Sequence, residues 1–283
     1  MNKISFDDLN GQVCVLTGGA GILGASLVRG LASVGVKTAI VDINEEAAVQ
    51  LAAEVEKESG TTTIGVAANV IDKDSLMAAK KLINGKLGKI SLLINGAGGN
   101  SPLATTQLEE ITPDSVSQLD KTFYGLNMEG FQRVYDLNFT GTLLPTMVFT
   151  TDMLEAGKGC ILNISSMNAY RPLTKTPAYA SAKASVHNFN EWLAVHLAKT
   201  GIRVNAIAPG FFLTNQNRFL LTDEKTGAPT PRGLKIIGNT PMGKYGKPDD
   251  LNGAMLFLLS DVSTFVTGIC IPVDGGYNAY GGV

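Results

Sequence analysis

Short apolar runs alternate with stretches of helical spacing along the whole chain. The first run, at residues 13–16, is long enough for a buried strand and too short for a helix, and leucines and valines at helical spacing follow it. Similar runs predict further strands at residues 38–41, 62–67, 90–94, 160–164, 204–207 and 269–273. Helices are predicted at about 45–59, from about 72, at 178–200 and at 249–259.

The predicted strands are apolar on both faces. Strands of this kind, alternating with helices, are typical of a parallel sheet that helices cover on both sides. The alternation continues without a break in composition, a repeat or a linker, so residues 1–283 are interpreted as a single α/β domain. Residues 101–130 and 215–240 lack this alternation of predicted strands and helices. We expect both irregular segments near the carboxyl edge of the sheet, where such domains bind their ligands.

Composition narrows the classes of function. The chain is 45% apolar and 17% charged, and its formal net charge of −2 lacks the basic excess that a nucleic-acid partner favours. No apolar run approaches the roughly 20 residues of a membrane-spanning helix. Cys14, Cys160 and Cys270 stand apart in apolar runs, which predicts buried thiols of a cytoplasmic protein. The only histidines, His187 and His196, do not have the spacing of a close helical ligand pair, so no metal is predicted.

The turn after the first strand is rich in glycine. Residues 17–24 read Thr-Gly-Gly-Ala-Gly-Ile-Leu-Gly and lead into a helix. Glycine lets the backbone approach a pyrophosphate, and the helix N-terminus offers free N–H groups and the positive end of its dipole. Asp42 ends the second strand, where a carboxylate can bind the adenosine ribose and repel a 2′-phosphate. These features predict NAD rather than NADP. The alternatives are a purely structural turn and, for Asp42, an acid that caps the helix beginning near Glu45.

Tyr179 and Lys183 lie four residues apart in a helical stretch, which puts both on one helix face. A free tyrosine has a pKa of about 10. A nearby ammonium favours the phenolate, by at most about 3 pKa units. Such a tyrosine could exchange a proton with a substrate hydroxyl. The alternative is an amphipathic helix with a core tyrosine and a solvated lysine.

Several motifs share the order found in the short-chain dehydrogenase/reductase family, which the chain resembles over nearly its full length. Residues 95–98 read Asn-Gly-Ala-Gly, residues 163–166 Asn-Ile-Ser-Ser, residues 209–214 Pro-Gly-Phe-Phe-Leu-Thr and residues 273–276 Val-Asp-Gly-Gly. The resemblance implies a single-domain Rossmann fold, a doubly wound seven-stranded parallel sheet with helices on both faces.

The resemblance also implies roles for residues of this chain. Tyr179 exchanges the proton, and Lys183 lowers its pKa and holds the nicotinamide ribose. Ser166 orients the reacting oxygen, and Asn138 orders a water that links Lys183 to solvent. The implied cofactor contacts are Gly18, Gly21, Ile22, Leu23, Gly24, Asp42, Asn69, Val70, Asn95, Gly96, Ala97, Tyr179, Lys183, Pro209, Gly210, Phe212 and Thr214. Two positions depart from the family pattern, since Ile22 stands at the usual middle glycine and Asn69 at a common aspartate.

The second irregular segment is polar and basic. Such groups suit a hydroxylated, anionic ligand, because buried hydroxyls need partners and a carboxylate favours a cation. A solvated surface loop is the alternative. The predicted substrate contacts are Asn100, Ser166, Asn168, Tyr179 and Arg218. The cation for a substrate carboxylate is left open among Arg171, Lys175, Arg218, Arg232 and Lys235.

Within the family, residues 95–100, 165–170, 209–217 and 277–283 are similar to those of the D-mannonate oxidoreductases of the short-chain type. This resemblance implies that a small-molecule sugar acid, D-fructuronate, is reduced by NADH to D-mannonate. The alternatives are another sugar-acid or polyol dehydrogenase, such as a gluconate 5-dehydrogenase, and a nucleotide-binding sensor without catalysis. Relatives are commonly homotetramers, so we expect a homotetramer. The tail from Gly276 is expected to pack against a neighbour or to cover the site.

Overall fold

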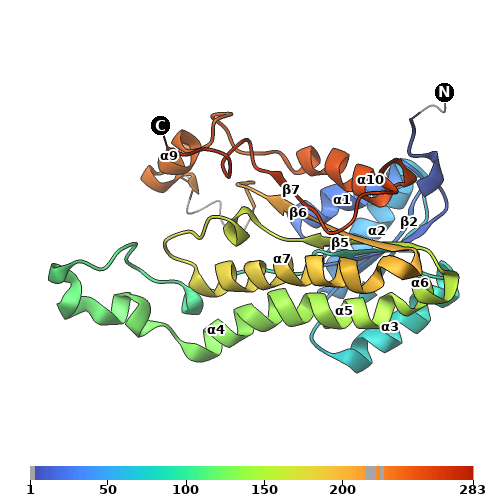
Figure 1. Ribbon diagram of the computed structural model, residues 1–283, viewed down its shortest axis with the longest axis horizontal. Helices are drawn as coiled ribbons and strands as arrows, with labels where there is room; N and C mark the ends of the chain where they lie inside the picture. Colours follow the sequence, from blue (N-terminus) through green and yellow to red (C-terminus); the bar gives the residue numbers. More distant parts are fainter. Residues whose placement is uncertain (1–3, 215–220, 224–225, 283) are drawn as a thin grey trace.

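The computed structural model describes residues 4–214, 221–223 and 226–282. Its centre is a seven-stranded sheet in the order β3-β2-β1-β4-β5-β6-β7, and every neighbouring pair is parallel (Figure 1). The strand order reverses direction beside β1, which is the hallmark of a doubly wound sheet. The predicted fold class, a Rossmann-type α/β domain, is confirmed.

The sheet is built from strands β1 (Val13–Thr17), β2 (Lys37–Asp42), β3 (Thr63–Ala67), β4 (Leu92–Asn95), β5 (Gly159–Ile164), β6 (Ile202–Pro209) and β7 (Cys270–Val273). The helices up to the middle of the chain are α1 (Ile22–Ala32), α2 (Glu45–Ser59), α3 (Lys73–Lys86), α4 (Met128–Tyr135) and α5 (Gly141–Phe149). Those after it are α6 (Thr151–Ala156), α7 (Pro177–Leu197), α9 (Pro231–Gly238) and α10 (Asn252–Leu259).

Two apolar layers sandwich the sheet. Alternate residues of β1 face opposite sides, so that Cys14 and Leu16 pack with α1, α2 and α10, while Val13 and Val15 pack with α3, α5, α6 and α7 (Figure 1). Burying a large aliphatic side chain contributes roughly 1.5–3 kcal/mol. Apolar side chains therefore occupy both faces of the central strands, which explains the continuous apolar runs of the sequence.

The two irregular segments contain more helix than the sequence predicted. In residues 101–130 the chain forms short 3-10 turns at 102–104, 113–121 and 123–125, and α4 begins at Met128. In residues 215–240 it forms α9, which Thr230 caps by accepting a hydrogen bond from the Gly233 N–H. The remaining predicted strands and helices are confirmed to within a few residues.

The described parts of both segments project beyond the carboxyl edge of the sheet, at the left of Figure 1. The segment of residues 101–126 forms an arm that extends to the left of α4 and α7, and α9 lies near the C-terminal tail (Figure 1). The strand ends, the start of α7 and these two segments therefore frame the same region. Across the described residues, no helix has both the length and the apolar character required to cross a membrane.

Candidate active site

Three of the four predicted catalytic side chains converge where β5 meets α7. Ser166 lies just beyond the end of β5, and Tyr179 and Lys183 lie near the start of α7. Ser166 forms a hydrogen bond with Tyr179. The ammonium of Lys183 donates to the Ile164 carbonyl at 2.8 Å and lies 5.7 Å from the centre of the Tyr179 ring. The end of β5 thus supplies one polar side chain and one carbonyl that position the pair on α7.

Burial controls the protonation of this pair. It raises the pKa of Tyr179, although the hydrogen bond from Ser166 acts in the opposite direction. Burial also lowers the pKa of Lys183 to about 8. The predicted pKa of Tyr179, below that of free tyrosine, is therefore wrong for the cofactor-free protein, because loss of hydration disfavours the phenolate. At neutral pH the tyrosine keeps its proton and can donate it.

Asn138 lies on the other side of the site, in a π-helical turn at Asp136–Thr140 between α4 and α5. Its side chain is completely buried. The amide donates to the carbonyls of Gly99 and Val134, both at 2.7 Å, and its oxygen accepts from the Gly99 N–H at 3.2 Å. Single π-turns inside helices frequently occur at functional sites. Here the π-turn carries an asparagine that fixes the chain leaving β4.

Gly98 brings Asn138 and Lys183 together. A Cβ at this position would lie 2.6 Å from the Asn138 side-chain oxygen and 3.2 Å from the Lys183 nitrogen. Both polar atoms therefore approach one backbone position that only glycine leaves open. Gly98 stands in the motif of residues 95–98 but was not predicted as a site residue. The signal that could have identified it is the second glycine of that motif.

A cavity of about 390 Å³ lies between the carboxyl ends of β1, β2 and β4. Many of the predicted cofactor contacts line it, namely Gly18, Gly21, Asp42, Asn69, Val70, Gly96 and Ala97. The sequence did not predict the eight other lining residues, Ala20, Val41, Ile43, Asn44, Ala47, Ala68, Gly98 and Leu137. The cavity thus lies at the switch point of the sheet, where doubly wound domains bind nucleotides.

The glycine-rich turn has the close packing that a pyrophosphate site requires. Gly18 has a φ of +67°, and a Cβ there would lie 2.7 Å from the Ala97 Cα. A Cβ on Gly24 would lie 2.7 Å from the Gly18 carbonyl oxygen. Gly21 begins α1 without a side-chain cap, and Ile22 and Leu23 follow as its first residues. Their N–H groups lack intrahelical partners and suit a phosphate.

Asp42 is held at the rim of this cavity. Its two carboxylate oxygens accept from the N–H groups of Ala20 and Asn44, each at 3.1 Å. Asn44, not Asp42, caps α2 by accepting from the Ala47 N–H. The alternative of Asp42 as the helix cap is therefore wrong. A fixed carboxylate beside a glycine turn fits the adenosine ribose of a dinucleotide.

Asn69 and Asn95 have different surroundings. Asn69 lines the cavity, and its side-chain oxygen accepts from the Ile71 N–H at 3.1 Å. The NH₂ of the same side chain is therefore the group that can donate to a ligand. Asn95 is 1% exposed, and its amide donates to Thr146 and Asn163 in the core. The side chain of Asn95 is thus held by the core, and its predicted contact with the cofactor stays a prediction.

The segment after β6 closes the opposite side of the site. Pro209 ends β6, and Gly210 packs so closely that its Cβ would lie 2.6 Å from the Asp274 Cα. Phe212 is buried and bridges to Gly246, and Thr214 is partly buried. The ring of Phe211 packs edge-on against Tyr277, with ring centres 5.2 Å apart. The C-terminal tail thus lies against its own chain beside the predicted nicotinamide segment.

The three remaining substrate predictions fall in different surroundings. Asn168 is 7% exposed, its N–H donates to the Ser166 hydroxyl, and its buried side-chain oxygen has no hydrogen-bond partner among the described residues. Asn100 is exposed and donates to Thr105 within the arm at 2.9 Å. Arg218 lies outside the described residues. Of the two that the structure describes, only Asn168 combines burial with an unpaired polar atom next to Ser166.

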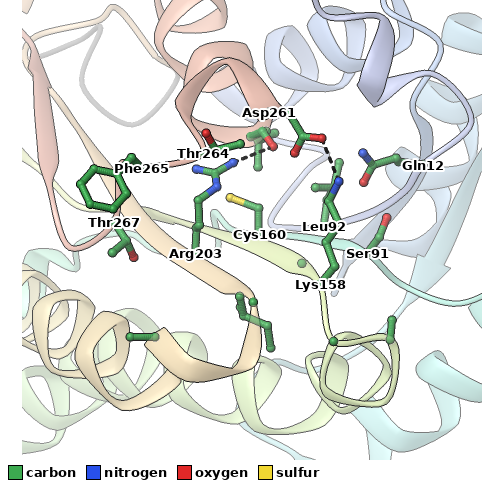
Figure 2. A pocket seen from close by; sticks show the side chains of 17 residues that line it. Gln12, Ser91, Leu92, Lys158, Cys160, Arg203, Asp261, Thr264, Phe265 and Thr267 are labelled. Atoms are coloured by element: carbon green, nitrogen blue, oxygen red, sulfur yellow. Dashed lines mark hydrogen bonds and ion pairs between the residues drawn. The ribbon is translucent and has the colours of Figure 1, made fainter.

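A second cavity, of about 990 Å³, lies at the opposite edge of the sheet. Figure 2 shows Cys160 and Arg203 projecting into it and Lys158 paired with Asp261 on its wall, at 2.8 Å. The Arg203 guanidinium donates to carbonyls around the end of α10, including that of Ser260 at 2.9 Å. The donors of Arg203 therefore connect β6 to the end of α10. This cavity lies at the amino ends of the strands, away from the predicted active site.

The histidines and cysteines form no metal centre. His187 lies edge-on against Tyr170, and His196 stacks on Trp192. Across residues 4–214, 221–223 and 226–282, no cluster of three or more histidine, cysteine or acidic side chains could hold a metal ion. Cys14 and Cys160 are buried, and Cys270 is partly buried.

Comparisons with known proteins agree with this site. The profile of the short chain dehydrogenase family matches residues 12–225. The chain is 48% identical to an uncharacterized oxidoreductase of Bacillus subtilis, UxuB, over 98% of both chains. It is 31% identical to a 2-dehydro-3-deoxy-D-gluconate 5-dehydrogenase of Formosa agariphila, over 97% of this chain and 95% of the relative.

A crystal structure of a protein from Haemophilus, described provisionally as a D-mannonate oxidoreductase and containing bound NAD, superposes with a TM-score of 0.92. It shares 45% sequence identity over 98% of both chains. The family profile, the full-length relatives and the geometry of the site agree. The chain therefore belongs to the short-chain dehydrogenase family.

Proposed function

We propose that the protein is an NAD-dependent oxidoreductase that interconverts D-fructuronate and D-mannonate. The observation that carries the proposal is the group of buried Ser166 and Lys183 and partly buried Tyr179 at the carboxyl edge of the sheet, where a cavity of about 390 Å³ also lies. The Haemophilus structure described as a D-mannonate oxidoreductase supports the substrate. Its bound NAD supports the cofactor.

The residues of the cavity fit NAD. The turn from Gly18 to Gly24 and the start of α1 would hold the pyrophosphate, and Asp42 would accept from the ribose hydroxyls of adenosine. The carboxylate of Asp42 would repel the 2′-phosphate of NADP. Thr214 and Lys183 would bind at the nicotinamide end. When bound, the cofactor supplies or accepts the hydride.

The side chains of the protein transfer the proton that accompanies the hydride. The hydroxyl of Tyr179 donates its proton to the keto oxygen during reduction, and takes one from the hydroxyl during oxidation. Ser166 hydrogen-bonds to the same oxygen and orients it. Lys183, held by the Ile164 carbonyl at 2.8 Å, places positive charge beside the tyrosine as it loses its proton. Asn138 holds the backbone on the far side of Lys183 through Gly99.

Asn168 supports a hydroxylated substrate. Its buried side-chain oxygen has no hydrogen-bond partner among the described residues, and an unsatisfied buried acceptor costs about 1–3 kcal/mol. A substrate hydroxyl next to the reacting carbon would satisfy it. A related acid substrate, reduced at another keto position, is the second candidate, because the chain is 31% identical to a sugar-acid 5-dehydrogenase. The intact Ser166, Tyr179 and Lys183 disfavour a sensor without catalysis.

A homotetramer in the cytoplasm is also proposed. Trp192 and Val195, on α7, are 57% and 79% exposed, and Met147 on α5 is 57% exposed. Apolar side chains grouped on a surface are typical of protein contacts. Light scattering of the purified protein would measure the number of chains.

The test of the function is the absorbance of reduced nicotinamide with purified protein, NADH or NADPH, and D-fructuronate. A 5-keto sugar acid and uncharged ketoses serve as comparison substrates. We expect fast oxidation of NADH with D-fructuronate, slow oxidation of NADPH, and loss of both rates in Tyr179→Phe. Turnover of another sugar in place of D-fructuronate would overturn the proposed substrate. Preference for NADPH would overturn the proposed role of Asp42 in selecting NAD.

A further inference from the structure

One carboxylate bridges the two irregular segments. Glu109, in the arm, pairs with Arg232 at 2.9 Å and with Lys235 at 3.2 Å, and both cations belong to α9. The Arg232 side chain is 25% exposed, and the Glu109 side chain 35%. Partial burial strengthens such a pair because water screens it less. These ion pairs therefore connect the arm to α9 at the carboxyl edge of the sheet.

A third cation faces the same carboxylate. The hydrogen bond from Lys235 is the largest cause that lowers the pKa of Glu109, and the charges of Arg232 and Lys175 add to this lowering. The backbone carbonyl of Lys175 accepts from the Thr106 N–H at 3.0 Å, which docks the arm on the chain just before α7. Lys175 is also four residues before Tyr179.

The cluster also lies near the nicotinamide side of the site. Burial raises the pKa of Tyr277, and the charge of Arg232 lowers it, so the guanidinium acts on this hydroxyl. The ring of Tyr277 packs against Phe211, in the segment that follows β6. Lys175 and Arg232 thus connect the charge cluster to the two segments that frame Tyr179.

The charges of this cluster do not cancel. Arg232 and Lys235 pair with Glu109, and the charge of Lys175 acts on the same carboxylate without an ion pair. The neighbouring Glu110 is exposed and forms no ion pair within the described part of the chain. A guanidinium carries five N–H donors, and Glu109 uses one nitrogen of Arg232. The cluster keeps positive charge and unused donors that suit a second carboxylate.

We propose that Lys175, Arg232 and Lys235 form the specificity determinant that binds the carboxylate of the substrate, and that Glu109 holds these cations in place while weakening their attraction for it. This inference rests on the proposed function, because it assigns the acid group of that substrate. It predicts opposite effects for two changes. Removing a cation lowers the preference for acids, and neutralising Glu109 raises it.

The experiment measures kcat/KM for D-fructuronate and for D-fructose, which lacks the carboxylate, and compares their ratio among variants. In Arg232→Met we expect the ratio to fall about 10- to 100-fold, the range for a lost charge-assisted hydrogen bond, mainly through a higher KM for the acid. In Glu109→Gln we expect the ratio to rise. The KM for NADH should stay unchanged in both variants.

Arg29→Met is the matched control, because Arg29, like Arg232, is an arginine in surface ion pairs, here with Glu54 and Glu58 of α2. It removes the same charge away from the cluster, so its ratio should equal that of the wild type. Lys175→Met is the second variant. It leaves the Glu109–Arg232 ion pair in place and should also lower the ratio if Arg232→Met does not fold.

Two failures can be told apart. If the wild type reduces D-fructuronate but the ratio stays within twofold in Arg232→Met, Lys175→Met and Glu109→Gln, the cluster proposal is overturned and the function stands. If the wild type reduces only uncharged sugars, the proposed substrate class and the cluster proposal are both overturned. If it reduces a different keto acid, the same ratio with that acid and its uncharged analogue decides the cluster proposal.

Discussion

Replacing Lys183 by methionine should stabilise the cofactor-free protein at neutral pH while it removes catalysis. Lys183 is 3% exposed, and within the described residues its ammonium has no carboxylate partner. Its hydrogen bond goes to the Ile164 carbonyl at 2.8 Å. Methionine has nearly the same length and volume, so it fills the space without placing a charge there.

The magnitude follows from the pKa. Burial lowers the pKa of Lys183 from 10.5 to about 8, and each pKa unit corresponds to about 1.4 kcal/mol. Charged Lys183 therefore destabilises the folded state by about 3 kcal/mol at pH well below 8. Leaving the Ile164 carbonyl without its donor offsets about 1 kcal/mol of the gain. We expect Lys183→Met to raise the free energy of unfolding by about 2 kcal/mol at neutral pH.

The pH dependence gives a second check. In the wild type, the folded state releases the proton of Lys183 near pH 8, while the unfolded state keeps it up to about pH 10.5. Between these values the unfolded state binds more protons, so wild-type stability rises with pH. The difference in the free energy of unfolding between Lys183→Met and the wild type should therefore decrease from about pH 8 and vanish near pH 10.5. Other groups titrate there too, but they are common to both proteins.

The assay is urea unfolding at equal protein concentration, without cofactor, at neutral pH and again near pH 10. Lys80→Met is the control, because Lys80 pairs with buried Asp152 at 2.8 Å and its loss should destabilise. A variant Lys183→Met that is less stable than the wild type at neutral pH would refute the reasoning. An advantage that does not change with pH would refute its assignment to the charge of Lys183.

Three further predictions concern the site. Asp42→Ser should shift the ratio of kcat/KM for NADH over NADPH toward NADPH by about tenfold or more, because the loss of a carboxylate removes both the ribose acceptor and the repulsion of the 2′-phosphate; initial rates with each cofactor measure it. Tyr179→Phe should lower kcat by about 100- to 10,000-fold and keep NADH binding, which nicotinamide fluorescence measures. Gly98→Ala should lower kcat strongly, since its methyl would meet the Asn138 oxygen at 2.6 Å, whereas Gly85→Ala, in open space, should leave kcat unchanged.

The sequence predicted the parts of the fold that depend on local patterns. The apolar runs have the length of buried strands, and β1 to β7 form where those runs stand, because both faces of each strand are covered. The glycine-rich turn was also predicted from a local feature, the residue type itself. A Cβ on Gly18 or Gly24 would collide with nearby backbone, so the residue type itself reports the close approach.

The sequence could not predict what long-range packing decides. Glu109 pairs with Arg232, 123 residues away, and no local pattern links the two. The side chain of Asn95, at the end of β4, donates to Thr146 and Asn163 in the core, and its position in the sequence does not predict these partners. The pKa of Tyr179 was predicted in the wrong direction, because spacing on a helix shows the charge of Lys183 and does not show the loss of hydration.

The proposed function is tested most directly by the initial rate of NADH oxidation with D-fructuronate in the wild type and in Tyr179→Phe. We expect rapid oxidation by the wild type, D-mannonate as the product, and a rate in the variant that is at least about 100-fold lower. Wild-type protein that binds NADH but oxidises it with no sugar acid or ketose would refute the proposed function. It would favour instead a protein that senses the nucleotide.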